Sequence, residues 1–370
     1  KQFENDTDAN NVYSRAAETL TSWRTENALL KEDQPAIYAY AQSWTDSAGK
    51  KTTRYGFLSL VRIAPYEKNI VLPHEFTLSG PKTDRLNLTR ATQTTLSPIF
   101  LLYNDPETWV EKNVFNQAFW DKALNVTDPD GVLHTFLPIT DVETIGAITQ
   151  LMTPQQVIIA DGHHRYETSL TYQKEKREQA TDAPEGSLPC DYTLAFFTNT
   201  SSPGLKVYPT HRVIKHLPEG VSSSDFLAQL EEIFIPSTHP EMTLFWLQAG
   251  HNSPKQALQL KPGVDISMLP QPLKDLDVAI IDKLVFENIL KTDANTLKQN
   301  GDLAFVRDEA EVEAMLNAGE GDLPIVFYVH APDTHQIEAI CKSGFRMPQK
   351  STYFYPKLLS GLVLYSHPDN

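Results

Sequence analysis

One short run of polar residues has the types and spacing to do chemistry. Residues 161–167 read Asp-Gly-His-His-Arg-Tyr-Glu and follow directly on the apolar residues 156–160. We predict a short strand over 156–160, a sharp turn at Gly162 and a helix over 163–178 with a polar exposed face. This order places the side chains of the turn and the first N–H groups of the helix at one mouth, which is how α/β proteins hold anions.

Two other interpretations of this run stay open. Asp161 can cap the following helix, since aspartate is a favoured N-cap residue. Against this, four successive polar residues at a strand end are costly to bury without a purpose. A zinc hydrolase is the second possibility, with Asp161, His163, His164 and His211 as ligands. However, adjacent histidines diverge on a helix, and the i, i+4 spacing of HExxH is absent.

The rest of the chain alternates predicted helices and strands. We predict a helix over 9–31, a β-hairpin of strands 36–45 and 55–63, a helix within 82–95, a buried strand over 98–103, a helix over 141–152, strands over 192–198 and 207–214, and a capped helix over 222–234. The composition changes near residue 216, so we expect two domains, 1–215 and 216–370. The predicted fold class is mixed α/β (α+β).

Length and charge limit the classes of function. With 370 residues the chain exceeds what one hydrophobic core usually supports. Its net charge of −15 repels nucleic acids and anionic lipids. Cys190 and Cys341 form no CxxC pair, and no apolar run approaches the roughly 20 residues of a membrane span. We therefore expect a cytoplasmic protein with no nucleic-acid or membrane partner.

Several sequence blocks together resemble one bacterial protein family. The block at 158–168 reads Ile-Ile-Ala-Asp-Gly-His-His-Arg-Tyr-Glu-Thr, and the other blocks are residues 72–75, 82–85, 97–100, 209–212 and 347–357. Together they are similar to the family called domain of unknown function 1015, over nearly the whole chain. Members usually begin with a Pro-Pro-Tyr-Asp-like motif, which is absent here, so we expect a longer N-terminal segment.

A second, looser resemblance implies an activity. The order His-Glu, Arg, Pro-Ile, and then a strand followed by Asp-Gly-x-His-Arg, is similar to the ParB/sulfiredoxin-like superfamily and its free-serine kinases. This resemblance implies a ParB/sulfiredoxin-like N-terminal domain, with a smaller α+β C-terminal domain closing the site. It also implies that Glu75 activates a serine hydroxyl, and that Asp161, His164 and Arg165 handle nucleotide phosphates and a metal.

The residue types suit the phosphoryl transfer that this resemblance implies. Such a transfer needs positioning, neutralisation of phosphate charge and a group that takes the hydroxyl proton. Arg165 can donate to two phosphate oxygens, and Asp161 can hold Mg²⁺ together with phosphate oxygens and water. Glu75 or His164 can accept the proton. Further expected members of the site are His74, Arg85, Gly162, His163, His211, Arg212 and Lys350.

The outer members of this set also have ordinary structural interpretations. Glu75 alone is more often a solvated carboxylate, and His211 with Arg212 can lie on the surface at a strand end. The block 350–357 has three successive aromatic residues, so we slightly favour a strand that packs aromatic rings into the core. Lys350 and Lys357 can still point into the site.

The sequence leads to one preferred function and three alternatives. We predict an enzyme that transfers a phosphoryl group from ATP or ADP, with Mg²⁺, to the hydroxyl of a small molecule, with free L-serine as the leading candidate. A non-catalytic nucleotide-binding regulatory protein would share the residues 161–165 but would not need Glu75. A metal-dependent hydrolase ranks lower, and a structural interaction module would bind no ligand.

Overall fold

The chain folds into two compact units. The computed structural model describes residues 3, 6–46, 49–77, 80–251, 253–317 and 324–367. The first unit comprises Lys1–Pro73, Thr77–Lys206 and Pro356–Asn370, and the second comprises His74–Phe76 and Val207–Tyr355. The last segment, 356–370, therefore belongs to the first unit, whereas the sequence assigned it to a domain beginning at residue 216.

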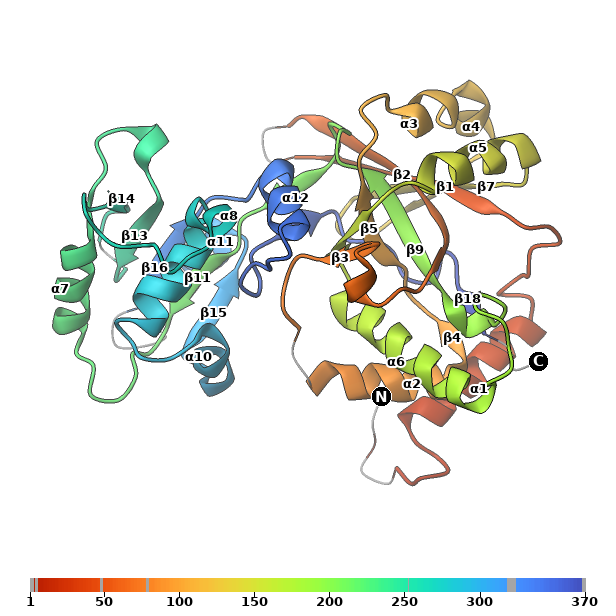
Figure 1. Ribbon diagram of the computed structural model, residues 1–370, viewed down its shortest axis with the longest axis horizontal. Coiled ribbons are helices and arrows are strands. Elements are labelled where there is room, and N and C mark those ends of the chain that lie inside the picture. The colour runs from red at the N-terminus through yellow and green to blue at the C-terminus, as the bar shows by residue number, and fades with distance from the viewer. Residues whose placement is uncertain are drawn as a thin grey trace. The chain divides into compact units, whose positions relative to one another are not determined.

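The first unit contains a mixed sheet of eight described strands (Figure 1). Their order is β3-β8-β5-β9-β2-β1-β7-β6, in which β3 pairs with β8 and β5 with β9 in parallel. β1 and β2 form the predicted antiparallel hairpin. In chain order the strands are β1 (Ile37–Thr45), β2 (Lys51–Arg62), β3 (Val71–Pro73), β5 (Ile99–Tyr103), β6 (Leu124–Thr127), β7 (Leu133–Ile139), β8 (Val157–Asp161) and β9 (Tyr192–Asn199).

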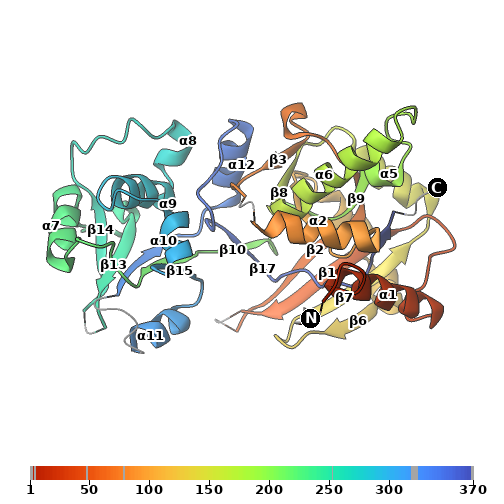
Figure 2. The same cartoon turned by 90° about the horizontal axis from the view of Figure 1, so that it is seen from below.

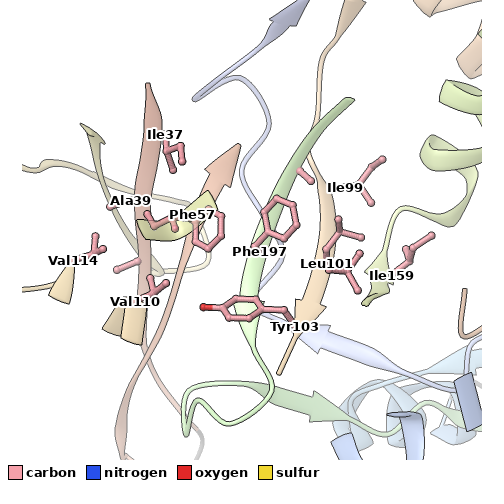
Figure 3. Close-up of a cluster of buried hydrophobic side chains, with 14 of the residues drawn as sticks. Ile37, Ala39, Phe57, Ile99, Leu101, Tyr103, Val110, Val114, Ile159 and Phe197 are labelled. Atoms are coloured by element: carbon pink, nitrogen blue, oxygen red, sulfur yellow. The ribbon is translucent and has the colours of Figure 1, made fainter. Parts of the chain in front are cut away.

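Helices supply the partners for one face of this sheet. The helices are α1 (Val12–Thr25), α2 (Gly80–Thr92), α3 (Trp109–Asn113), α4 (Gln117–Lys122), α5 (Val142–Met152) and α6 (His163–Gln179). In a strand, alternate residues share a face. Ile37, Ala39 and Ala41 of β1 accordingly pack in one cluster with Phe57, Leu101 and Phe197, and with side chains of α3, α4, α5 and α6 (Figure 3). α2 packs against both α1 and α6 (Figure 2).

The second unit is built on a smaller sheet. Its order is β12-β14-β13-β16-β11-β15, and neighbouring strands run antiparallel. The strands are β11 (His211–Ile214), β12 (Phe234–Pro236), β13 (Phe245–Ala249), β14 (Gln256–Leu260), β15 (Leu303–Val306) and β16 (Ile325–Val329). The main helices are α7 (Ser223–Ile233), α10 (Ala294–Asn300), α11 (Glu309–Asn317) and α12 (Thr334–Lys342). Two short helices, α8 (Gln271–Lys274) and α9 (Asp277–Ile280), lead into a π-helix over Ile281–Glu287.

Small two-stranded ribbons complete the described chain. β10 (Lys206–Tyr208) pairs with β17 (Tyr353–Tyr355), and β4 (Thr94–Thr95) pairs with β18 (Tyr365–Ser366). The three remaining short turns are 3₁₀-helices over Tyr66–Lys68, Pro189–Asp191 and Pro240–Met242.

These elements confirm the predicted mixed α/β class and correct two element boundaries. The residues 207–214 form the end of β10 and then β11, not one strand, because the intervening Pro209 has no N–H to donate to a ladder. The first helix is shorter than 9–31: Asn11 caps its start, and Asn27 beyond its end has a left-handed φ of 58°. Within the described part of the chain, no helix is long and apolar enough to cross a membrane.

Candidate functional site

The predicted strand–turn–helix of residues 156–178 is present in the first unit. Asp161 is the last residue of β8, and α6 begins at His163. Gly162 occupies the N-cap position with a φ of 99°, in the left-handed region that glycine adopts most easily. Because the N-cap is Gly162, which has no side chain, and Asp161 lies one residue before it, the interpretation of Asp161 as the N-cap of α6 is wrong. Its carboxylate is available for other contacts.

The Asp161 carboxylate lies between two cations. Its Oδ2 atom is 2.7 Å from Nη2 of Arg165, and its Oδ1 atom is 3.2 Å from Nζ of Lys357. Burial favours the neutral acid, but the charges of Lys357 and Arg165 outweigh burial and hold the pKa of Asp161 below its usual value. The three side chains therefore form a charged group of net +1.

Two contacts fix α6 and its arginine. The Tyr166 hydroxyl donates to the carbonyl of Ala64 at 2.8 Å and accepts from the N–H of the same residue at 2.9 Å. Arg165 also donates through Nη1 to the carbonyl of Pro98. A Cβ atom on Gly162 would lie 2.9 Å from Nε of Arg165, closer than side chains tolerate. Gly162 therefore both permits the turn before α6 and leaves room for the Arg165 guanidinium.

A pocket lies beside this group, within the first unit. It measures about 570 Å³, including the space at its open mouth. One wall is the face of α6 that carries residues 165, 168, 169 and 172, and another is residues 85, 88 and 89 of α2. The other lining residues are Ile63, Thr94, Thr95, Leu96, Ser97, Cys190, Thr193 and His367.

The lining of this pocket suits an anionic ligand that also carries hydroxyl or amine groups. Arg85 and Arg165 are its two cations, and none of the lining residues, which all lie in the described part of the chain, is acidic. Burial lowers the pKa of Arg165, Asp161 raises it, and the nearby charge of Arg85 lowers it. An anion between the two guanidinium groups would relieve their mutual repulsion. Seven threonine and serine residues supply further donors and acceptors.

The two predicted histidines of the turn have different surroundings. His163 is buried, and its charge when protonated would help to lower the pKa of Asp161. His164 is half-buried, and its carbonyl accepts a hydrogen bond from Thr168 at 2.7 Å. Across the described ranges, no group of three or more His, Cys, Asp or Glu side chains could hold a metal ion. The zinc-hydrolase alternative therefore finds no ligand set there.

Glu75 belongs to the second unit, where it holds a loop. Its Oε1 atom accepts from the N–H groups of Ser351 and Thr352, each at 3.1 Å, and from the Thr352 hydroxyl at 3.0 Å. Its Oε2 atom accepts from the N–H of Lys350 at 3.2 Å. The neighbouring His74 contacts the Thr352 hydroxyl at 2.7 Å. Glu75 is thus not the solvated carboxylate that its residue type suggested.

The other predicted residues of the second unit are more buried than expected. His211 and Arg212 lie inside the sheet on β11, so their interpretation as surface residues is wrong. Arg212 donates to the carbonyls of Thr210, Gln349 and Lys350, and burial lowers its pKa to about 10. Lys350 has a left-handed φ of 57°. Its N–H donates to Glu75 and its carbonyl accepts from Arg212, and these two hydrogen bonds hold the backbone in that conformation.

The predicted site residues therefore fall into two groups by unit. The first unit holds Arg85 and residues 161–165, and the second holds Glu75, His211, Arg212 and Lys350. Sequence reasoning missed the hydroxyl-rich wall of the pocket. A signal was present, because Arg165, Thr168, Ser169 and Tyr172 follow the i, i+3, i+4, i+7 spacing of one helix face.

Known structures resemble the chain only distantly. A conserved hypothetical protein from Pyrococcus furiosus is 12% identical, with 82% of this chain and 92% of that chain covered and a TM-score of 0.41. A free serine kinase in complex with AMP is 12% identical, with 84% and 89% covered and a TM-score of 0.42. SbnI with a C-terminal truncation, from Staphylococcus aureus, is 13% identical, with 83% and 85% covered and a TM-score of 0.40.

Family membership comes from the sequence itself. No curated protein matches the chain significantly. The family model described as "Protein of unknown function (DUF1015)" matches residues 1–279, which is most of the chain and includes the turn at 161–165. This confirms the resemblance seen in the sequence blocks, and the chain belongs to the DUF1015 family.

Proposed function

We propose that the protein is a nucleotide-dependent kinase for a small hydroxyl compound and that the first unit binds the nucleotide phosphates. The observation that carries this proposal is the charged group Asp161–Arg165–Lys357 beside a pocket with a second arginine, Arg85. Such a site gives a protein of net charge −15 a local place for a polyanion.

Each residue of the site has a part in this proposal. Arg165 donates to two phosphate oxygens when it leaves Asp161, and the N–H groups after Gly162 add donors at the start of a long helix. Asp161 would offer one carboxylate to Mg²⁺, an ion that proteins commonly hold through one or two carboxylates together with phosphate oxygens and water. The ion, once bound, neutralises phosphate charge. The nucleotide is ATP or ADP.

We also propose which molecule accepts the phosphoryl group and which residue takes its proton. Free L-serine is the first acceptor to test, because its hydroxyl is a simple nucleophile for phosphoryl transfer. For the acceptor proton we propose Glu75, with His164 as the alternative. Substituting Glu75 by Gln would then abolish turnover and leave nucleotide affinity unchanged.

One observation favours a second candidate, a non-catalytic nucleotide-binding regulatory protein. The Glu75 carboxylate accepts four hydrogen bonds from residues 350–352, and a carboxylate has only about four acceptor positions. This is what a residue with a purely structural task would do. A regulatory protein binds nucleotide without turnover, and the Glu75→Gln variant would bind it equally well.

Thermal unfolding with Mg²⁺ and one nucleotide at a time, with and without L-serine, tests the proposal. A ligand held only by the native state raises the unfolding midpoint. A rise with ATP or ADP, increased by serine and accompanied by phosphoserine formation, would support the kinase. A rise without product under any condition would support the regulatory protein. No rise with any nucleotide would reject both.

A further inference from the structure

A row of buried polar side chains crosses the first-unit sheet on the face opposite the main core. Arg54 of β2, Gln42 of β1 and His134 of β7 lie directly opposite one another in register. Each is fully buried. Arg54 donates to the Gln42 side-chain oxygen, and the Gln42 nitrogen lies 3.4 Å from Nδ1 of His134. Burying such groups is costly unless they have partners, so the row has a task that apolar residues cannot perform.

The task of this row is to hold the backbone of the returning C-terminal segment. Arg54 donates through Nη2 to the carbonyl of Pro356 at 2.6 Å, and Gln42 donates through Nε2 to the carbonyl of Lys357 at 2.8 Å. The N–H of Leu359 reaches the hydroxyl of Tyr40 at 3.5 Å. Three backbone groups within four residues are thus bound by buried side chains of β1 and β2.

Further side chains of the first unit fix the members of this row. His134 lies 2.6 Å from the Tyr40 hydroxyl through Nδ1 and 3.0 Å from Asp128 through Nε2. The Arg54 guanidinium stacks 4.6 Å from the centroid of the Phe100 ring. A Cβ atom at Gly56, opposite Tyr40, would lie 2.5 Å from the Phe196 ring, so only glycine fits. The position of the segment 356–359 is therefore closely determined.

The side chain of Lys357 leaves this fixed backbone and reaches the site. Its Nζ atom lies 3.2 Å from Oδ1 of Asp161. The side chain is 43% exposed and that of Asp161 is 40% exposed, so a ligand can approach both. An exposed ion pair is worth little, and a phosphate that carries more charge than a carboxylate can compete for the lysine.

From these contacts we infer that Lys357 is a phosphate-binding residue of the site, and that Gln42 and Arg54 are positioning residues that act through it. This inference rests on the proposed nucleotide binding and adds to it a third cation, brought from the other end of the sequence. The ligand group is a phosphate of the nucleotide, which a lysine binds as a point charge.

The experiment measures nucleotide affinity by calorimetry, at two salt concentrations, in single and double variants of the whole chain. Lys357→Met keeps the aliphatic stem and removes the charge, and we expect affinity to fall by about tenfold to hundredfold, as for other hydrogen bonds to charged groups. The dependence of affinity on salt should become weaker. Lys357→Arg should recover part of the loss. Lys122→Met, at the exposed end of α4, is the control and should bind as the unchanged protein does.

A double-variant cycle separates positioning from general damage. Gln42→Met removes the donor to the Lys357 carbonyl and keeps the side-chain volume close. If Gln42 acts through Lys357, the double variant Gln42→Met/Lys357→Met binds no more weakly than Lys357→Met alone. Additive losses would overturn the positioning role.

Two further outcomes distinguish the inference from the function on which it rests. Wild-type affinity in Lys357→Met, together with lost affinity in Arg165→Ala, would overturn the role of Lys357 and leave nucleotide binding intact. A wild-type protein that binds no nucleotide would overturn both.

Discussion

Arg165 links Asp161, the turn and the pocket, and its removal gives the most direct test of nucleotide binding. Arg165 donates to Asp161 and to the Pro98 carbonyl. A hydrogen bond to a charged group contributes about 1.5–3 kcal/mol. If one phosphate contact of this kind is lost, Arg165→Ala should bind nucleotide about tenfold to hundredfold more weakly. Arg165→Lys keeps the charge but not the paired donors, so its affinity should be intermediate.

The matched control for this substitution is Arg90→Ala. Arg90 lies on α2 and forms an exposed ion pair with Glu175, outside the pocket lining. The two alanine variants have the same net charge. Any difference in their nucleotide affinity therefore comes from the site and not from the electrostatic field of the whole protein. Calorimetric titration with ATP and Mg²⁺ measures both. If circular dichroism shows that all three proteins are folded, equal nucleotide affinities in Arg165→Ala, Arg90→Ala and the unchanged protein would refute the role of Arg165 in nucleotide binding.

Two other predictions concern the turn and the pocket. Gly162→Ala should lower the free energy of unfolding by about 1–2 kcal/mol, measured by urea unfolding, because φ is positive there. It should also weaken nucleotide binding, measured by calorimetric titration, because the new methyl group displaces Arg165. An unchanged nucleotide affinity would contradict this second expectation. Burial lowers the pKa of His367, which contacts the Thr95 hydroxyl at 2.8 Å. The folded protein therefore binds fewer protons there than the unfolded chain, so its contribution to stability is present above pH of about 6.5 and is lost as pH falls below that. Between pH of about 8 and about 5.5 the free energy of unfolding, measured with urea, should fall less in His367→Gln than in the unchanged protein. An equal fall in both proteins would contradict a lowered pKa of His367.

The local pattern of the sequence predicts much of the first unit. The strand and helix around Asp161 have strong periodicity, with a glycine between them, and they are found as predicted. The hairpin of β1 and β2 and the capped α7 are confirmed for the same reason, since their signals come from neighbouring residues. The membership in a family was also readable, because it depends on short blocks of residues.

Contacts between distant residues could not be predicted in this way. Lys357 lies 196 positions from Asp161, and no periodicity connects the two. Glu75 was predicted as a base, with a solvated carboxylate as the alternative, because residue type alone gives no information on a loop at 350–352. Arg212 was predicted as a site residue, with a surface position as the alternative, since arginine is seldom buried unless paired. Nothing in the sequence indicated its carbonyl partners at 349–350. In each case the sequence shows the residue type but not which distant residue its side chain contacts.

The return of the chain to its first unit has a consequence for biosynthesis. A domain that is continuous in sequence can fold while the ribosome is still translating the next one. Here Arg54, Gln42 and Tyr40 cannot meet their backbone partners until residues 356–359 have been synthesised, about 300 residues after the strands that carry them. During that interval the emerging sheet exposes polar groups that will later be buried. A nascent chain stalled before residue 356 should therefore be held in an unfinished state, open to chaperones and proteases, whereas one that has passed this point can close.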